Sequence, residues 1–227
     1  MPAAGILISK DNSGIGLDIQ NSFFVSNQGV YITIFNPEQE FFIENNTFAN
    51  NTEFNAAPKS SLIDLIYTDS SAVRNFAITD NIFNGNTAKY IARVFEKDEE
   101  MSVSVLRKRH EIAKNHFNNN TGWSLIFASV ALTDIFGNTF QSKEMKCDIT
   151  TNEPRKPNWL DLQKNEFIAF PDNLKYFHVC ATSFEGTITY PWEGHFRDIT
   201  VTTTTTPPPP PVPPVTPAPP PPPPPAA

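Results

Sequence analysis

A six-residue frame recurs along most of this chain: an aliphatic residue, two variable residues, an asparagine, one further residue and a phenylalanine. It reads IENNTF at 43–48, and five copies keep the full pattern. The frame phenylalanines are Phe23, Phe48, Phe83, Phe117, Phe140 and Phe167. Their spacings of 25, 35, 34, 23 and 27 residues fall in the range of repeat proteins and vary as inserted loops would make them vary. The chain is therefore expected to fold as stacked repeats.

The frame asparagines are Asn21, Asn46, Asn81, Asn115, Asn138 and Asn165. The first copy, LDIQNSF, has Asp18 in place of the aliphatic residue, as a terminal repeat allows. A short, alternating apolar segment follows each phenylalanine, so each unit reads as strand, asparagine turn, strand. Stacking such units at about 4.8 Å buries a column that one unit cannot bury alone. We expect each asparagine to adopt the left-handed bend itself and to bond the neighbouring turn, which makes an asparagine ladder.

The repeat resembles that of pectin-lyase-like parallel β-helix proteins over roughly residues 5–190. The predicted fold is all-β: a right-handed parallel β-helix of about six coils in residues 1–198, followed by a Thr/Pro-rich disordered tail in residues 199–227. An antiparallel β-sandwich remains the alternative, because a single sequence does not reveal strand direction. The 9 glycines and the lone Asn-Gly pair are few for the many hairpins of a sandwich.

The tail after Thr202 holds 15 of the chain's 22 prolines and carries no charge. Such a segment cannot build a core and favours an extended polyproline II rod. We expect it to act as a stalk or spacer, or to bind a partner that recognises polyproline.

The formal net charge of −7 provides no basic face for phosphates, so the composition argues against nucleic acid as a partner. No apolar run is long enough to span a membrane. Three N-x-T sequons begin at Asn45, Asn50 and Asn119, which makes these residues candidate glycosylation sites. We therefore expect an extracellular or cell-surface protein whose secretion signal lies outside this sequence.

Resemblance to polysaccharide lyases implies a calcium-binding cluster of aspartates with a basic residue nearby. The candidates are Asp64, Asp80, Asp134, Asp148 and Asp161. They share no common register, so we interpret them as solvated turn residues. The four histidines lack metal-ligand spacing and are interpreted as turn or strand surface residues. We assign no catalytic, metal-binding or cofactor-binding residue, expect no cofactor, and favour a noncatalytic protein over an enzyme.

Two further features are local. Cys147 and Cys180 lie in second strands of neighbouring repeats, where they form either a disulfide or two buried thiols. Tyr190, Trp192 and His195 follow the last clear repeat. They are candidates for a cap on the open end of the solenoid or, alternatively, for a sugar-stacking site.

These features favour a noncatalytic extracellular recognition or scaffold module that contacts a protein or glycan at the cell surface. The repeat also resembles the β-helix portions of Bark beetle (Anakonda)-type cell-junction ectodomains. The alternative is a carbohydrate-active enzyme or polysaccharide-binding protein, because β-helices host both kinds of function.

Overall fold

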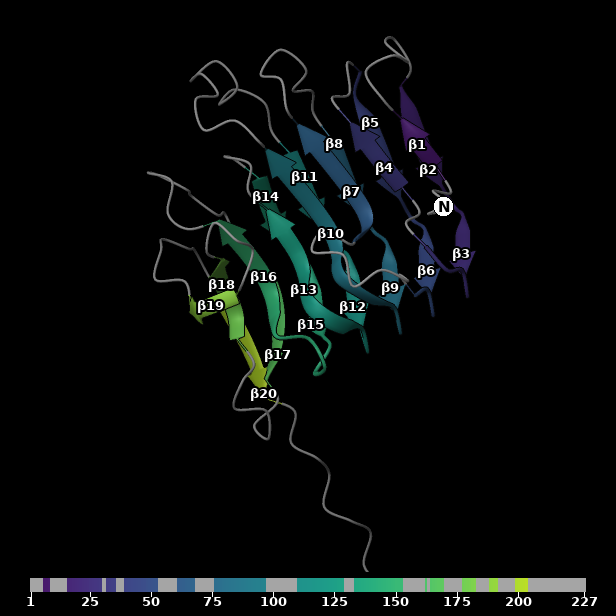
Figure 1. The fold of residues 1–227 in the computed structure, drawn as a ribbon. Helices are drawn as coiled ribbons and strands as arrows, with labels where there is room; N and C mark the ends of the chain where they lie inside the picture. Colours follow the sequence, from purple (N-terminus) through teal and green to yellow (C-terminus); the bar gives the residue numbers. More distant parts are fainter. Residues whose placement is uncertain are drawn as a thin grey trace, which may run out of the picture.

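The computed structural model describes residues 6–8, 16–29, 32–35, 39–52, 61–67, 76–96, 110–128, 133–152, 162, 164–169, 177–182, 188–191 and 199–203 (Figure 1). Every regular element in these ranges is a β-strand. Within them there is accordingly no helix with the length and apolar character needed to cross a membrane.

The strands form three sheets, here called A, B and C. Sheet A contains β1 (Ile6–Ile8), β4 (Ile32–Phe35), β7 (Ser61–Tyr67), β10 (Thr87–Glu96), β13 (Thr121–Ala128), β16 (Cys147–Asn152), β18 (Phe177–Thr182) and β19 (Ile188–Pro191). Sheet B contains β2 (Leu17–Gln20), β5 (Phe41–Glu44), β8 (Phe76–Thr79), β11 (His110–Ala113) and β14 (Thr133–Phe136). Sheet C contains β3 (Phe23–Val25), β6 (Thr47–Ala49), β9 (Ile82–Asn84), β12 (His116–Asn118), β15 (Thr139–Gln141), β17 (Asn165–Ala169) and β20 (Ile199–Thr203).

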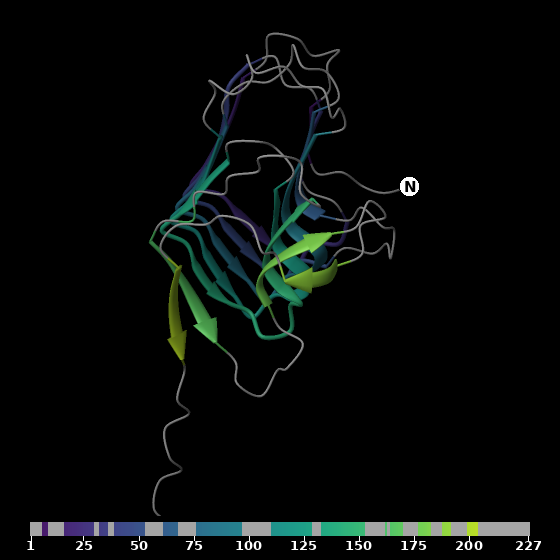
Figure 2. The ribbon, with the colours of Figure 1, turned by 90° about the vertical axis from the view of Figure 1, so that its left-hand side faces the viewer.

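In coils 1–5 the described chain passes through sheet B, then sheet C, then sheet A, and equivalent strands of successive coils pair in parallel. Turned by 90° (Figure 2), the stacked strands line up around a common interior. Among the described strands, only β18 and β19 pair antiparallel. The predicted parallel β-helix is confirmed, and the β-sandwich alternative is wrong. We number the coils by their sheet C strand, from coil 1 with β3 to coil 6 with β17.

Sheets B and C each contribute a column of apolar side chains to the interior, and sheet A adds buried aliphatic residues such as Ile63, Leu65 and Ile126. The aliphatic residues of the frame occupy matching positions in sheet B, and Ile43, Ile78, Ile112 and Ile135 are fully buried there. Five of the frame phenylalanines stack in sheet C, and Phe24, not Phe23, begins the column. The centroid separations are 4.7, 4.9, 4.9, 5.3 and 5.0 Å along Phe24, Phe48, Phe83, Phe117, Phe140 and Phe167. Near-parallel rings at this spacing follow from the distance between adjacent strands.

The turn between sheets B and C carries the predicted asparagine ladder. In Asn81, the side-chain Oδ1 accepts hydrogen bonds from the backbone N–H and the Nδ2 of Asn46, at 2.9 and 3.0 Å. Its Nδ2 donates to the carbonyl oxygen of Ile43, at 2.8 Å. The same pattern links Asn46, Asn81, Asn115, Asn138 and Asn165, which are at most 1% exposed. Each amide thereby ties its own coil to the preceding one.

The ladder asparagine does not make the bend itself, contrary to the expectation from sequence. The left-handed residue is the one before it: Asn45, Asp80, Lys114 and Lys164 have φ of 53, 56, 55 and 57° at this turn, and Gly137 has φ of 64°. One residue adopts the strained backbone and faces solvent, while the next turns its amide inward. The two tasks that the sequence assigned to one asparagine are divided between neighbours.

In coil 1, the positions of the six-residue frame lie one residue later in the chain than the sequence predicts. Asn21 pairs in position with Asn45 and has φ of 51°, so it is the bend residue. Ser22 takes the ladder position, because its backbone N–H donates to Asn46 Oδ1 at 3.0 Å. The frame residues of coil 1 are accordingly Ile19, which is buried, and Phe24, which is partly buried; they lie opposite Ile43 and Phe48. The predicted ladder role of Asn21 is wrong, as is the placement of Phe23 in the aromatic column.

A second ladder, which the sequence analysis missed, lies at the turn between sheets C and A. Asn86 Oδ1 accepts hydrogen bonds from the N–H and Nδ2 of Asn51, at 3.1 and 2.9 Å. The ladder runs through Asn27, Asn51, Asn86, Asn120 and Ser142. The recurring Asn-Thr pair three residues after the frame phenylalanine was its signal in the sequence.

The carboxyl end of the domain extends beyond the predicted boundary at residue 198. Residues 199–203, which the sequence placed in the disordered tail, form β20 and pair in parallel with β17. The segment ITVTT is rich in β-branched residues, which suits the open edge of sheet C. Residues 204–227, with the proline runs, lie outside the described residues.

We expect Asn115→Ala to lower the free energy of unfolding by about 3 kcal/mol or more, because it leaves several buried polar groups without partners. Asn115 is fully buried and bonds Asn81, Ile78 and Asn138. Denaturant unfolding measures the change. The matched control is Asn118→Ala, on the outer side of the same coil, which should change stability by less than about 0.5 kcal/mol. Equal losses in the two variants would contradict the ladder's role.

Candidate functional site

The three sequon asparagines lie on the outside of the turns. Asn45 precedes β6, Asn50 follows it, and Asn119 follows β12; all three are exposed and have φ of 53, 54 and 52°. The middle residue of each sequon is a ladder asparagine, and these residues (Asn46, Asn51 and Asn120) are buried. The acceptor nitrogens of the sequons therefore belong to the solvent-facing residues, and the fold-determining amides belong to their neighbours.

The left-handed turn also explains one glycine. Gly85 occupies the position of Asn50 in the next coil and has φ of 67°. A Cβ atom at Gly85 would lie 2.5 Å from Asn50 Oδ1. Because Gly85 has no Cβ atom, the neighbouring coil leaves room for the side chain of Asn50.

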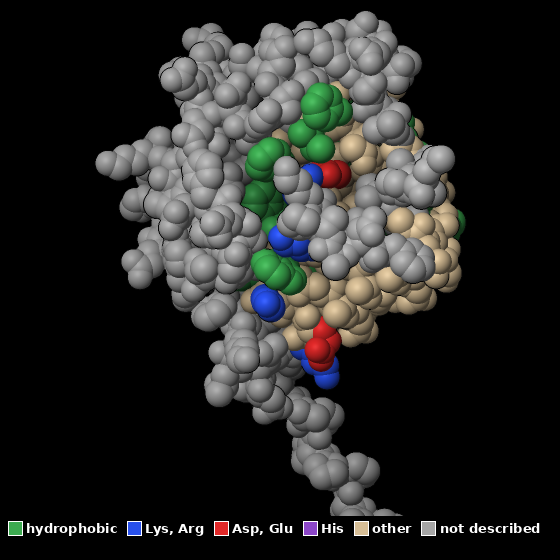
Figure 3. Space-filling model, viewed as in Figure 1, with side chains coloured by type: hydrophobic (Ala, Val, Ile, Leu, Met, Phe, Trp, Pro, Cys, Tyr) green, Lys and Arg blue, Asp and Glu red, His purple; other side chains and the backbone are tan. Residues whose placement is uncertain are grey.

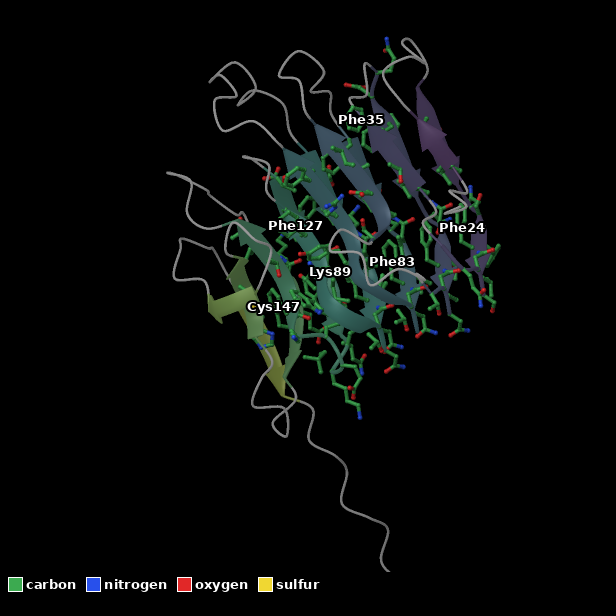
Figure 4. All side chains as sticks on the ribbon, in the orientation of Figure 1. Phe24, Phe35, Phe83, Lys89, Phe127 and Cys147 are labelled. Carbon is green, nitrogen blue, oxygen red and sulfur yellow. A yellow bond between two sulfur atoms is a disulfide. The ribbon has the colours of Figure 1, made fainter. Side chains whose placement is uncertain are left out.

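Cys147 and Cys180 lie in the adjacent strands β16 and β18, and both are fully buried. A disulfide joins them, with a Cα–Cα distance of 6.2 Å. It connects coil 5 to coil 6, near the carboxyl end of sheet A (Figure 4). A cross-link at this position would oppose fraying of the last coil.

An imidazole–carboxylate pair lies beside this disulfide. His178 Nδ1 is 2.9 Å from Asp148 Oδ2, and the His178 ring is 5.0 Å from the ring of Phe167. Asp148 is fully buried, so its interpretation as a solvated turn residue is wrong. His178 lies on strand β18 with its side chain 24% exposed, as a strand surface residue would, but one side of its ring packs on Phe167 of the aromatic column. The partner for both residues comes from another coil, which linear spacing does not reveal.

The outer face of sheet A carries a buried ion pair. Arg93 Nε donates to Asp64 Oδ1 at 2.7 Å, and Arg93 Nη2 donates to Asp64 Oδ2 at 2.5 Å. Asp64 is 6% exposed and Arg93 is 5% exposed. The solvated interpretation of Asp64 is therefore wrong as well. A bidentate pair of this kind satisfies both charges, and the loss of either partner would leave the other buried and uncompensated.

Aromatic residues continue this outer face. The rings of Tyr90 and Phe127 are 5.0 Å apart and tilted, and the guanidinium of Arg93 lies 5.5 Å from the ring of Phe95. Burial raises the pKa of Tyr90 to about 12, although the positive charge of Arg93 acts in the opposite direction. Hydrophobic side chains and basic groups run together down the face of sheet A in Figure 3, where part of this face is open to view.

The solvent-accessible part of the face holds one tryptophan between two lysines. Trp123 is in register with Lys89 on β10, and its carbonyl oxygen accepts the backbone N–H of Lys146. The Nζ atoms of Lys89 and Lys146 lie 4.3 and 4.6 Å from the Trp123 ring. Burial lowers the pKa of Lys89, and the charge of Arg93 lowers it further. We call Lys89, Trp123 and Lys146 the tryptophan–lysine row.

Chemically, this row offers an apolar ring and two cations on one surface. An aromatic face and adjacent ammonium groups suit a ligand that has both apolar and anionic parts. Among the described residues, no group of three or more His, Cys, Asp or Glu is arranged to hold a metal ion. The predicted cap or sugar-stacking residues Trp192 and His195 lie outside the described part of the chain. Tyr190 belongs to β19, opposite Ala181 of β18.

No protein-family model matches the sequence, and no curated protein or solved structure matches it.

The raised pKa of Tyr90 predicts a specific pH dependence of stability. Because the folded protein keeps the phenolic proton after the unfolded chain has lost it, this contribution is full below about pH 10 and is lost as the pH rises toward about 12. Unfolding free energies measured between pH 8 and 12 should fall more steeply for the native protein than for Tyr90→Phe. Identical slopes would show that Tyr90 titrates normally in the fold.

Proposed function

We propose that this protein is a noncatalytic extracellular recognition or scaffold module, a glycosylated β-solenoid that binds a protein or glycan at the cell surface. The observation that supports it best is the position of the sequons. All three acceptor asparagines face solvent on turns, so that glycans could be attached without disturbing the buried amides beside them. Bulky, polar modifications are tolerated at such surface positions.

The Cys147–Cys180 cross-link supports the same proposal, because stable disulfides belong mainly to secreted and cell-surface proteins. The stacked coils provide a rigid support with long outer faces on which recognition residues can be displayed. We also propose that the protein is related to pectin-lyase-like proteins and, among them, to the β-helix portions of Bark beetle (Anakonda)-type ectodomains. In this proposal, the proline-rich tail is a spacer or the site of a polyproline-binding partner.

Intact mass spectrometry on protein from its native cells tests the proposal. We expect glycan mass that falls stepwise in Asn45→Gln, Asn50→Gln and Asn119→Gln, and a gain of two hydrogens on reduction. The matched control is Asn84→Gln, an asparagine of sheet C outside any sequon, which should leave the glycan mass unchanged. A fully reduced chain without glycan would overturn the extracellular assignment.

A second candidate function, polysaccharide binding, is favoured by the tryptophan–lysine row. A ring with two ammonium groups over it would suit an acidic polysaccharide, whose sugar faces are partly apolar and whose carboxylates or sulfates are anionic. The outer face of sheet A provides the necessary length along the solenoid axis.

Binding to polygalacturonate, alginate and heparin tests this candidate. If the row binds such chains, Trp123→Ala should weaken binding at least about tenfold, the equivalent of about 1.4 kcal/mol. Lys146→Gln should weaken it and reduce its salt dependence. Lys114→Gln, an equal loss of charge at the turn between sheets B and C, should have little effect. Any depolymerised product in these assays would point to an enzyme and contradict the noncatalytic proposal.

A further inference from the structure

Within the described part of the chain, the exposed large hydrophobic side chains gather on the outer face of sheet C. Phe23 is 78% exposed, Val25 is 49% exposed and Ile82 is 45% exposed. All three lie in the first three coils, on β3 and β9. Leaving a phenylalanine this open to water is unfavourable, and clustered exposed apolar groups mark a surface that something covers.

The register of sheet C places these residues around β6. Phe23, Thr47 and Ile82 occupy consecutive positions in one outward row, and Val25 lies beside Ala49 in the next row. The strand at the centre of the patch is therefore β6. Its two flanking turn residues are Asn45 and Asn50, both acceptors in sequons.

The amide of Asn45 is directed toward the coil that carries Phe23. Its Nδ2 donates to Asn21 Oδ1 at 2.6 Å, and Asn21 is the bend residue immediately before β3. Nδ2 is the atom to which an N-linked glycan is attached, and one N–H remains on the amide afterwards. A glycan at this atom would start beside coil 1 and next to the apolar patch.

We propose that Phe23, with Val25 and Ile82, forms a platform on which the first sugar of an N-glycan on Asn45 packs. The first sugar of such glycans is an N-acetylhexosamine, whose C–H face is apolar while its hydroxyls lie at the edge. The ring of Phe23 covers that face and leaves the hydroxyls in water. This inference rests on the proposed glycosylation and assigns a structural role to one of its three sites.

A tethered sugar suits this patch better than a second copy of the chain. A stable interface between copies buries about 800 Å² on each partner, whereas here three exposed side chains surround the polar Thr47. Glycans on Asn45 and Asn50 would also border the patch at both ends of β6. A sugar attached at Asn45 needs no separate binding event, because its effective concentration at the platform is high.

Asn119 provides an internal control. It follows β12, whose outward residues are His116 and Asn118, and the neighbouring Thr139 and Gln141 are also polar. At the end of β12 that leads to Asn119, the neighbours of Asn118 are Asn84 and Gln141, whereas Ile82 lies beside His116 at the opposite end of the strand. A glycan at Asn119 therefore starts next to polar residues of sheet C. The platform is specific to the coils around β6.

The test is a thermal-unfolding cycle on the secreted glycoprotein, trimmed enzymatically to one N-acetylhexosamine at each site. Phe23→Ser should lower the Tm by about 2–4 °C more when Asn45 is present than in the Asn45→Gln background. The same cycle with Asn119→Gln should show no coupling. Ile82→Thr should give a smaller coupling of the same sign, and nuclear Overhauser contacts should join the Phe23 ring to the sugar on Asn45.

Each other outcome overturns the inference in a distinguishable way. A glycan on Asn45 with no coupling to Phe23 rejects the platform but leaves the glycosylated module intact. Concentration-dependent dimerisation that Phe23→Ser abolishes would assign the patch to a second copy of the chain. Absence of glycan on Asn45 alone rejects the platform, whereas absence at all three sequons also rejects the proposed function.

Discussion

The hydrogen bonds of the two asparagine ladders are the interaction on which the rest of this structure depends. A parallel coil must reverse direction at each corner, and a reversal leaves backbone N–H and C=O groups without strand partners. Each ladder amide satisfies such groups in the preceding coil, as Asn81 does for Asn46 and Ile43. Because these bonds link one coil to the next, they also fix the register in which the phenylalanines stack.

The repeat made the parallel β-helix predictable, because an aliphatic residue, an asparagine and a phenylalanine at constant spacing demand identical stacked corners. The register of coil 1 was not predictable from the same frame. The segment NSFF contains two phenylalanines, and the asparagine two residues before the first of them suggested the wrong alignment. Burial of Ile19 and the bond from Ser22 to Asn46 decide the register, and both depend on coil 2.

The two buried aspartates show a different limit of sequence analysis. Asp64 meets Arg93 across 29 residues, and Asp148 meets His178 across 30, in each case between neighbouring strands of sheet A. Their partners become visible only when the exact register of successive coils is known, and coil lengths vary through inserted loops. Most aspartates in proteins are exposed, and for that reason both carboxylates were expected to face solvent. That expectation is wrong for Asp64 and for Asp148, because both are buried.

The division of labour at each turn separates what the fold requires from what the surface is free to vary. The fold requires a left-handed residue followed by a buried amide, and the first position is filled by Asp80, Lys114 and Gly137 as readily as by Asn45. The ladder therefore does not require an asparagine at the left-handed position or a threonine two residues after it. The sequons at Asn45, Asn50 and Asn119 occupy positions where the solenoid accepts several residue types, which is where a modification can be gained or lost without cost to the core.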